Sequence, residues 1–234
     1  MTCATLFARA PVPGRVKTRL QARLSPEQTA RLYQAFLQDS CDLLLASQAN
    51  RKVIASADAA GLASLQVLLD PASSAGLTFE VQQGDDLGRR MAHALQAAFD
   101  NGAQRAVIVG TDAPSLPTTS IDSALQALTT ADVVLGPVVD GGYYLVGATR
   151  DGFAVAAPCL FDDIDWSTGR VLQQSITRLP DELALALLPP WYDVDHPADA
   201  VFLRTHLTGL ARAGDERAPH SRQALDGLDL PDLT

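Results

Sequence analysis

The chain has 234 residues, of which 47% are hydrophobic and 19% are charged, and its formal net charge at pH 7 is −9. This length and composition predict a packed α/β domain rather than a disordered chain. The negative charge argues against a nucleic-acid-binding surface, because binding to the phosphate backbone requires a basic face.

The first predicted elements are a strand, a cationic loop and a long helix. The run from Thr2 to Ala8 is typical of a buried strand. After the loop, Ser25 is the expected N-cap of a helix, Pro26 suits its first position, and Gln28 completes a capping box. Apolar residues at helical spacing follow these start signals, which supports the helix.

The rest of the chain alternates between strand and helix patterns. In order, the patterns predict a strand from 51, an Ala/Leu-rich helix to about 69, a strand from 77, a helix over 86–99, a strand from 105, a further helix, strands at DVVLGPV and GYYLVGA, a helix within 167–177, a strand over 183–188 and a helix over 197–211. This alternation predicts a mostly parallel sheet covered by helices on both faces. The turn signal VDGG predicts a hairpin between the two strands that flank it.

One domain is expected to span residues 1–211. The linker-like patch PASSAG near Pro71 is too short to divide domains. Residues 212–234 are polar and show no periodicity, which predicts a mobile tail, with a short terminal helix as the alternative.

The cysteines and the hydropathy pattern bear on location. Cys3, Cys41 and Cys159 are odd in number and far apart, which favours reduced thiols in a cytoplasm over a disulfide framework or a zinc site. No window reaches about 18 uninterrupted apolar residues, and the N-terminal apolar run is too short for a signal peptide. We therefore expect a cytoplasmic protein with no membrane span; the sequence indicates no oligomeric state.

The stretch FARAPVPGRVKTRL places four cations directly after the first strand. These are Arg9, Arg15, Lys17 and Arg19. Two prolines and Gly14 favour a fixed, non-helical path at the carboxyl end of a strand, where open α/β sheets bind ligands. The stretch fits neither GxxxxGK[ST] nor GxGxxG. Because four like charges repel one another unless an anion offsets them, we predict a diphosphate site; the alternative is a solvated basic turn.

Two later stretches offer carboxylates for a metal ion. Asp112 in VIVGTDAPSLP lies just past a buried strand, and a carboxylate there can hold Mg²⁺ against substrate phosphates; an Asx-turn or N-cap is the alternative. Asp193 and Asp195 in WYDVDHPADA are two residues apart, and Asp195 would be the second ligand or else the cap of the helix at Pro197. His196 beside it is more often a bystander than a ligand.

Two further stretches suggest contacts to a sugar or an acceptor. In VVDGGYYLVG, Asp140 precedes two glycines and two tyrosines; the alternative is a hairpin turn whose tyrosines belong to the core. In FDDIDWSTGR, three acidic residues precede Trp166, and this group is typical of an acceptor pocket, with Ser167 as a helix cap being the alternative.

The motifs together resemble a known family. The stretches FARAPVPGRVKTRL, QGDDLGRRM, GTDAPSLP, DVVLGPVVDGGYYLVG, DWST and PPWYDVDHPADA, in this order, are similar to the bacterial DUF2064 family of glycosyltransferase-A-like proteins over about Leu6 to Ala200. Members are described as nucleotide-diphospho-sugar transferases or arsenosugar-biosynthesis glycosyltransferases, related in fold to molybdenum-cofactor and phospholactate nucleotidyltransferases. The resemblance implies a three-layer α/β/α nucleotide-diphospho-sugar transferase (GT-A) fold, whose seven-stranded, mostly parallel sheet has one antiparallel strand.

The resemblance also implies roles for residues. The nucleotide would be bound by Ala8, Arg9, Ala10, Gly14, Arg15, Lys17, Arg19, Gln83 and Gly84. The sugar or acceptor would border Gly141, Gly142, Tyr143, Trp166 and Ser167. Asp112 and Asp195 would hold Mg²⁺ or Mn²⁺, although the chain has Thr-Asp-Ala in place of DxD, and His196 replaces the threonine of Asp-Thr-Pro.

The expected reaction is metal-dependent glycosyl transfer from a nucleotide-diphospho-sugar to an unknown acceptor. Asp112 and Asp140 are the expected catalytic residues, with Asp140 as the base and Asp163 or Asp165 as alternatives. Nucleotidyl transfer from an NTP to a phosphorylated substrate has similar electrostatics and is the second hypothesis. A nucleotide-binding protein without turnover is the third.

Overall fold

The structure is a computed structural model that describes residues 1–69 and 76–230. Most of the linker-like stretch near Pro71 lies outside the described residues. The strands are β1 (Thr2–Ala8), β2 (Arg51–Ser56), β3 (Leu77–Val81), β4 (Arg105–Val109), β5 (Val133–Pro137), β6 (Tyr143–Thr149) and β7 (Leu185–Leu187). The helices are the 3₁₀ helix η1 (Thr18–Ala22), α1 (Pro26–Ala46), α2 (Ala59–Leu68), α3 (Leu87–Asp100), α4 (Ser120–Ala127), α5 (Arg150–Phe161), α6 (Val171–Arg178), α7 (Pro197–Arg212) and α8 (Pro219–Asp226).

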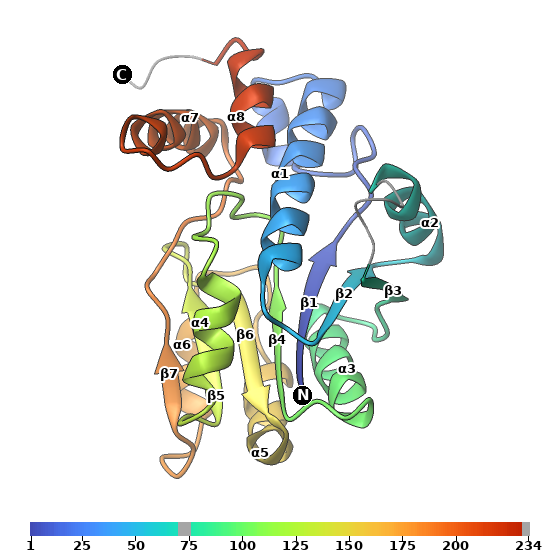
Figure 1. Ribbon diagram of the computed structural model, residues 1–234, viewed down its shortest axis with the longest axis vertical. Helices are drawn as coiled ribbons and strands as arrows, with labels where there is room; N and C mark the ends of the chain where they lie inside the picture. The colour runs from blue at the N-terminus through green and yellow to red at the C-terminus, as the bar shows by residue number, and fades with distance from the viewer. Residues whose placement is uncertain (70–75, 231–234) are drawn as a thin grey trace.

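The strands form one twisted sheet with the order β3-β2-β1-β4-β6-β5-β7 (Figure 1). Strand β6 runs antiparallel to both β4 and β5, and the other pairings are parallel. The predicted hairpin is confirmed, because β5 and β6 are joined by a turn in which Val138 N donates to Gly142 O at 3.0 Å. The three-layer fold with one reversed strand is therefore as the sequence predicts.

Alternating residues of the central strands divide the core between the two faces of the sheet. Ala4 and Leu6 of β1 pack in the cluster that contains the apolar residues of α1, α2 and α4. Cys3 of the same strand packs in the cluster that contains α3 and α5. A third cluster, formed by η1, α1, α7 and α8, closes the end of the molecule beside the carboxyl end of β1 (Figure 1).

Helix α5 was not expected from the sequence. Thr149 is its N-cap and accepts from Gly152 N at 3.0 Å, while Phe153 and Leu160 bury its apolar side. Pro158 lies within the helix, and a proline inside a pattern argues against a helix because it lacks the amide donor. For this reason the sequence does not predict the helix. Packing against α3 and the sheet outweighs the free-energy cost of the hydrogen bond that Pro158 cannot make.

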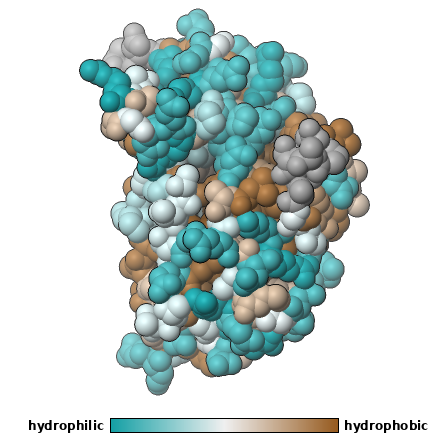
Figure 2. Space-filling view, in the orientation of Figure 1, coloured by the Kyte–Doolittle hydropathy of each residue, from teal (hydrophilic) through white to brown (hydrophobic). Residues whose placement is uncertain are grey.

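Helix α8 lies within residues 212–234, where we expected a mobile tail and had a short terminal helix as the alternative. The alternative matches the structure. The Asp39 carboxylate of α1 accepts from His220 N at 3.1 Å, from Ser221 N at 2.8 Å and from the Ser221 hydroxyl. Leu225 is fully buried against α1 and α7. Figure 2 shows mainly hydrophilic residues over the end formed by α7 and α8, in keeping with the polar sequence of this segment.

We predict that Asp39→Ala lowers the free energy of unfolding by about 1–3 kcal/mol, because it leaves the first amides of α8 without their acceptor. Urea unfolding followed by circular dichroism measures the change. Asp42→Ala is the control, since Asp42 lies one turn along the same helix and has only an exposed contact with α8, to His220 Nε2 at 3.4 Å. Because exposed ion pairs contribute little, it should change the stability by less than about 0.5 kcal/mol. Equal losses in the two variants would contradict the capping role of Asp39.

Candidate active site

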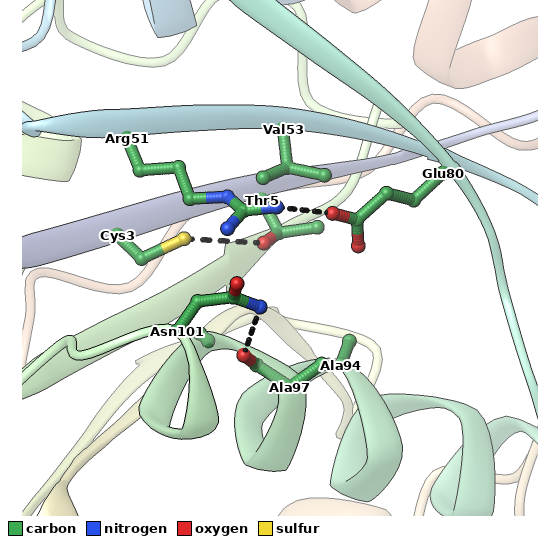
Figure 3. A pocket seen from close by; sticks show the side chains of 9 residues that line it. Cys3, Thr5, Arg51, Val53, Glu80, Ala94, Ala97 and Asn101 are labelled. Atoms are coloured by element: carbon green, nitrogen blue, oxygen red, sulfur yellow. Dashed lines mark hydrogen bonds and ion pairs between the residues drawn. The ribbon is translucent and has the colours of Figure 1, made fainter.

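A cleft of about 840 Å³ opens at the edge of the sheet where β1 and β4 end and β6 begins. Its walls come from the loop over residues 9–19, the first turn of α3, the β5–β6 hairpin, residues 166–171 and residues 193–195. A far smaller cavity, of about 10 Å³, lies between β1, β2, β3 and α3 and is lined by Cys3, Thr5, Arg51 and Glu80 (Figure 3). It has room for about one water molecule, so the large cleft is the candidate site.

Lys17 connects two acids that are distant in the sequence. Its Nζ lies 2.7 Å from Asp112 Oδ1 and 2.8 Å from Asp195 Oδ1, and its side chain is only 5% exposed. Arg19 Nη1 approaches Asp195 Oδ2 at 3.2 Å. Burial alone would lower the pKa of Lys17, but the two carboxylates outweigh it and raise the pKa, so the lysine is charged. The predicted convergence of Lys17, Arg19, Asp112 and Asp195 is therefore present.

The loop that carries Lys17 is fixed by its own hydrogen bonds and by two apolar anchors. Arg15 N donates to Val12 O at 3.0 Å. Val16 and Leu20 are buried in the cluster with α1 and α7, on either side of Lys17. Lys17 itself has φ 46° and ψ 43°, a left-handed conformation that costs a non-glycine residue about 1–2 kcal/mol. The two ion pairs of the Lys17 ammonium accompany this strained backbone conformation.

Asp193 is a third carboxylate in the cleft. The sequence places it beside Asp195 but predicts no role for it in the site. Its Oδ1 is buried and has no hydrogen-bond partner. Burial, followed by the charge of Asp112, raises the pKa of Asp193 to about 7, against the opposing charge of Lys17. The Asp-x-Asp spacing in an extended segment was the signal for it, because residues two apart face the same side.

Asp195 does not cap α7, so this alternative is wrong. The N-cap residue is His196, and the Asp199 carboxylate accepts from His196 N at 2.7 Å and from Asp195 N at 3.0 Å. The Asp195 side chain is thus free to face Lys17. Asp112 is not an N-cap either, since α4 begins only at Ser120, and Val194 N donates to Asp112 O at 2.8 Å. This backbone bond holds the two acidic segments together.

Tyr33 of α1 supports the same region, although the helical pattern of the sequence gives it no role in the site. Its hydroxyl accepts from Arg9 N at 3.1 Å and shares a hydrogen bond with Thr111 Oγ1 at 3.0 Å. It is 4% exposed and lines the cleft. Tyr33 therefore ties the start of the cationic loop to the strand end that carries Asp112.

The opposite side of the cleft is aromatic. The rings of Tyr143 and Trp166 are 6.3 Å apart and nearly perpendicular. Trp166 packs on Gly88 so closely that a Cβ there would lie 2.8 Å from the indole ring. Both tyrosines line the cleft and also pack in the core. The Tyr144 hydroxyl donates to Pro189 O at 3.2 Å, whereas the Tyr143 hydroxyl is buried without a hydrogen-bond partner among the described residues. Ser167 does not cap α6, whose N-cap is Arg170.

Most of the predicted site residues line the cleft. These are Ala8, Arg9, Arg15, Lys17, Arg19, Asp112, Asp140, Gly142, Tyr143, Trp166, Ser167 and Asp195. Other predicted residues are not in its lining: Ala10, Gly14, Gln83, Gly84 and Gly141. Gly84 has φ 133° and packs on the first turn of α3, and Gly141 packs on Gly169, so both are used for close backbone contacts instead.

The alternatives for the catalytic base are separated by their positions. Asp140 lines the cleft, and its Oδ1 accepts from Gly142 N at 2.9 Å. Asp163 and Asp165 do not line it, and Asp165 is paired with Arg170 at 3.0 Å. Among the described residues, one group of three potential metal ligands has all its ligand atoms within 4.8 Å, and it lies outside the cleft: Asp39, Asp42 and His220.

The chain has the α/β fold of the nucleotidyltransferases and nucleotide-sugar transferases. The chain belongs to the DUF2064 family, described as uncharacterized proteins conserved in bacteria, whose model matches residues 33–168. No helix in the described ranges is long and apolar enough to cross a membrane.

Three similar proteins give context. A candidate nucleotide-diphospho-sugar transferase from Desulfovibrio desulfuricans G20 is 34% identical, with a TM-score of 0.83 and 96% of each chain covered. A 2-phospho-L-lactate guanylyltransferase from Methanothermobacter thermautotrophicus is 32% identical over 129 residues, which is 54% of this chain and 53% of that protein. The match thus spans about half the length of this curated relative. The manganese complex of Rv0371C from Mycobacterium tuberculosis H37Rv shares the fold, with 14% identity, a TM-score of 0.51, and 86% of this chain and 96% of that chain covered.

We predict that the buried carboxyl of Asp193 makes the metal-free protein less stable as the pH rises. Its pKa in the folded state, about 7, is above that of an unfolded chain, so the folded state binds the extra proton between these values. The free energy of unfolding should fall by at most about 4 kcal/mol from pH 4 to pH 7. Urea unfolding in EDTA across this range measures it.

Asp193→Asn should remove this contribution to the slope, whereas Asp181→Asn, at an exposed acid in the loop before β7, should keep it. A slope that is the same in wild type and Asp193→Asn would contradict the assignment.

Proposed function

We propose that the protein is a metal-dependent glycosyltransferase that uses a nucleotide-diphospho-sugar donor. The observation that carries this proposal is the contact of one buried lysine, Lys17, with both Asp112 and Asp195 in the floor of a large cleft. The cationic side chains suit the phosphates of such a donor, and the adjacent carboxylates suit a divalent cation bound to those phosphates.

The cationic loop is the proposed diphosphate site. Arg9 and Arg15 line the cleft and have no ion-pair partner in the described part of the chain. Their guanidinium groups are thus available to an anion, and Lys17 and Arg19 add charge beside them. We assign the diphosphate of the donor to this loop and stabilisation of the leaving group to its cations.

The acids of the cleft suit a divalent cation. Asp112, Asp193 and Asp195 offer carboxylate oxygens, the ligands preferred by Mg²⁺ and Mn²⁺, and the buried Asp193 Oδ1 lacks any partner. We assign Asp112 and Asp195 as the ligands, with Asp193 beside them. When bound, such an ion would neutralise the charge that develops on the leaving diphosphate.

The sugar and the acceptor are assigned to the side of the cleft formed by Asp140, Gly142, Tyr143, Trp166 and Ser167. The lining residues from 140 to 171 include no lysine or arginine. A phosphorylated acceptor would therefore lie beside the Asp140 carboxylate with no cation from this segment, so an uncharged hydroxyl acceptor is favoured. Asp140 is the proposed base that takes the proton from this hydroxyl.

Nucleotidyl transfer is the second candidate, and the similarity to a guanylyltransferase over 129 residues favours it. In this reaction the cationic loop would hold an NTP, and the substrate attacks its α-phosphate with release of pyrophosphate. The same residues serve both reactions, so the products distinguish them.

We predict that the purified protein with Mn²⁺ releases nucleoside diphosphate slowly from a nucleotide sugar, even with water as the acceptor. Chromatography of the nucleotides after incubation with a panel of nucleotide sugars and NTPs measures this. Release of pyrophosphate from an NTP would instead support nucleotidyl transfer, and binding without turnover of either class would contradict both enzymatic candidates.

Asp112→Asn should lower the rate at least 100-fold, because it removes a proposed metal ligand. Asp181→Asn is the control, since this acid is exposed and is not part of the cleft lining. Full metal-dependent activity in Asp112→Asn would contradict the proposed role.

A further inference from the structure

We propose that Lys17 competes with the divalent cation for Asp112 and Asp195, and that it gives up this position only when phosphates enter the cleft. The inference rests on the proposed function, because it concerns the same acids. It adds that the cation and the phosphate ligand bind cooperatively, and that one side chain is the cause.

The first step of the argument is geometric. The Lys17 ammonium lies within 2.8 Å of one oxygen from each carboxylate, Asp112 Oδ1 and Asp195 Oδ1. A cation held by the same two oxygens would take the same place between them. Two positive charges at so short a distance repel each other strongly in a partly buried site, so the two modes exclude each other.

The second step concerns charge balance in the free protein. Asp112, Asp193, Asp195 and Asp140 all line this cleft, and Arg19 reaches Asp195 Oδ2, the oxygen that Lys17 does not contact. The Lys17 side chain is the buried cation among them, with 5% exposure. Because neighbouring carboxylates repel one another without a counter-charge, Lys17 stabilises the empty cleft and weakens metal binding to it.

The third step is the alternative position for Lys17. Val16 and Leu20 are buried on either side of it and hold the loop in place. Lys17 can therefore leave the two carboxylates without movement of the rest of the loop. Its backbone is in the strained left-handed region, with φ 46°, so a change of conformation at this residue can relieve strain. The neighbouring Arg9 and Arg15 face the same cleft, so a polyphosphate bound by them offers the ammonium new anionic partners.

The consequence is a coupling of two ligands. A phosphate ligand that draws Lys17 away leaves Asp112 and Asp195 available to the cation, and a bound cation in turn strengthens phosphate binding by the same factor. Without Lys17, the protein should bind the cation tightly even in the absence of phosphate. The coupling between cation and phosphate binding should then be largely lost.

The test measures Mn²⁺ binding by electron paramagnetic resonance of the unbound ion, with no need for activity. All proteins carry Asp42→Asn, an exposed position in α1, to remove the separate ligand group of Asp39, Asp42 and His220. We expect Lys17→Met to bind Mn²⁺ at least tenfold more tightly than the parent protein. Lys17→Arg, which keeps the charge, should bind as weakly as the parent.

The second arm adds inorganic pyrophosphate, corrected by a titration without protein. Pyrophosphate should tighten Mn²⁺ binding at least tenfold in the parent and less than threefold in Lys17→Met. Thermal unfolding confirms that each variant is folded, and Lys17→Gln is the second variant if Lys17→Met fails to fold.

The failures are distinguishable. Unchanged or weaker Mn²⁺ binding in Lys17→Met would overturn the competition. If Asp112→Asn and Asp195→Asn also leave Mn²⁺ binding unchanged in the Lys17→Met protein, the proposed metal site fails, and the competition with it. If these two substitutions abolish binding while Lys17→Met does not tighten it, only the competition is overturned.

Discussion

The ion pairs of Lys17 with Asp112 and Asp195 are the interaction on which the site depends. They join three segments: the loop after β1, the end of β4, and the residues that precede α7. A buried ammonium is stable only with carboxylates beside it, so the three segments have to close together as the chain folds. The apolar anchors Val16 and Leu20 and the backbone bond from Val194 to Asp112 fix this arrangement from outside.

The layout of charge gives the cleft two different sides. The loop of residues 9–19 brings arginines that face the cleft, while the segment from 140 to 171 brings an acid, aromatic rings and a hydroxyl. One ligand with an anionic part and a neutral ring part matches both sides, which is the reason for preferring a nucleotide-diphospho-sugar. The reversed strand β6 is essential to this layout, because its first residue, Tyr143, lies at the edge where β1 and β4 end.

Local patterns were enough to predict the elements that position the site. The capping box at Ser25 is present as predicted, with Gln28 N donating to Ser25 Oγ at 3.1 Å. The rule that ligands bind at the carboxyl ends of strands brought Lys17 and Asp112 together correctly. Tyr33 could not be found in this way, because its partners Arg9 and Thr111 are 24 and 78 residues away. Helix α8 is only an alternative in the sequence for the same reason, since Asp39, which accepts from its first amides, lies in α1.

A crystal structure with Mn²⁺ and a nucleoside diphosphate, with the metal located by its anomalous scattering, tests the central claim most directly. The account predicts one strong peak between Asp112 and Asp195, with the two phosphates against the loop of residues 9–19 and Lys17 turned toward them. A nucleotide bound away from this loop, or Lys17 still paired with both acids beside a bound metal, would contradict it.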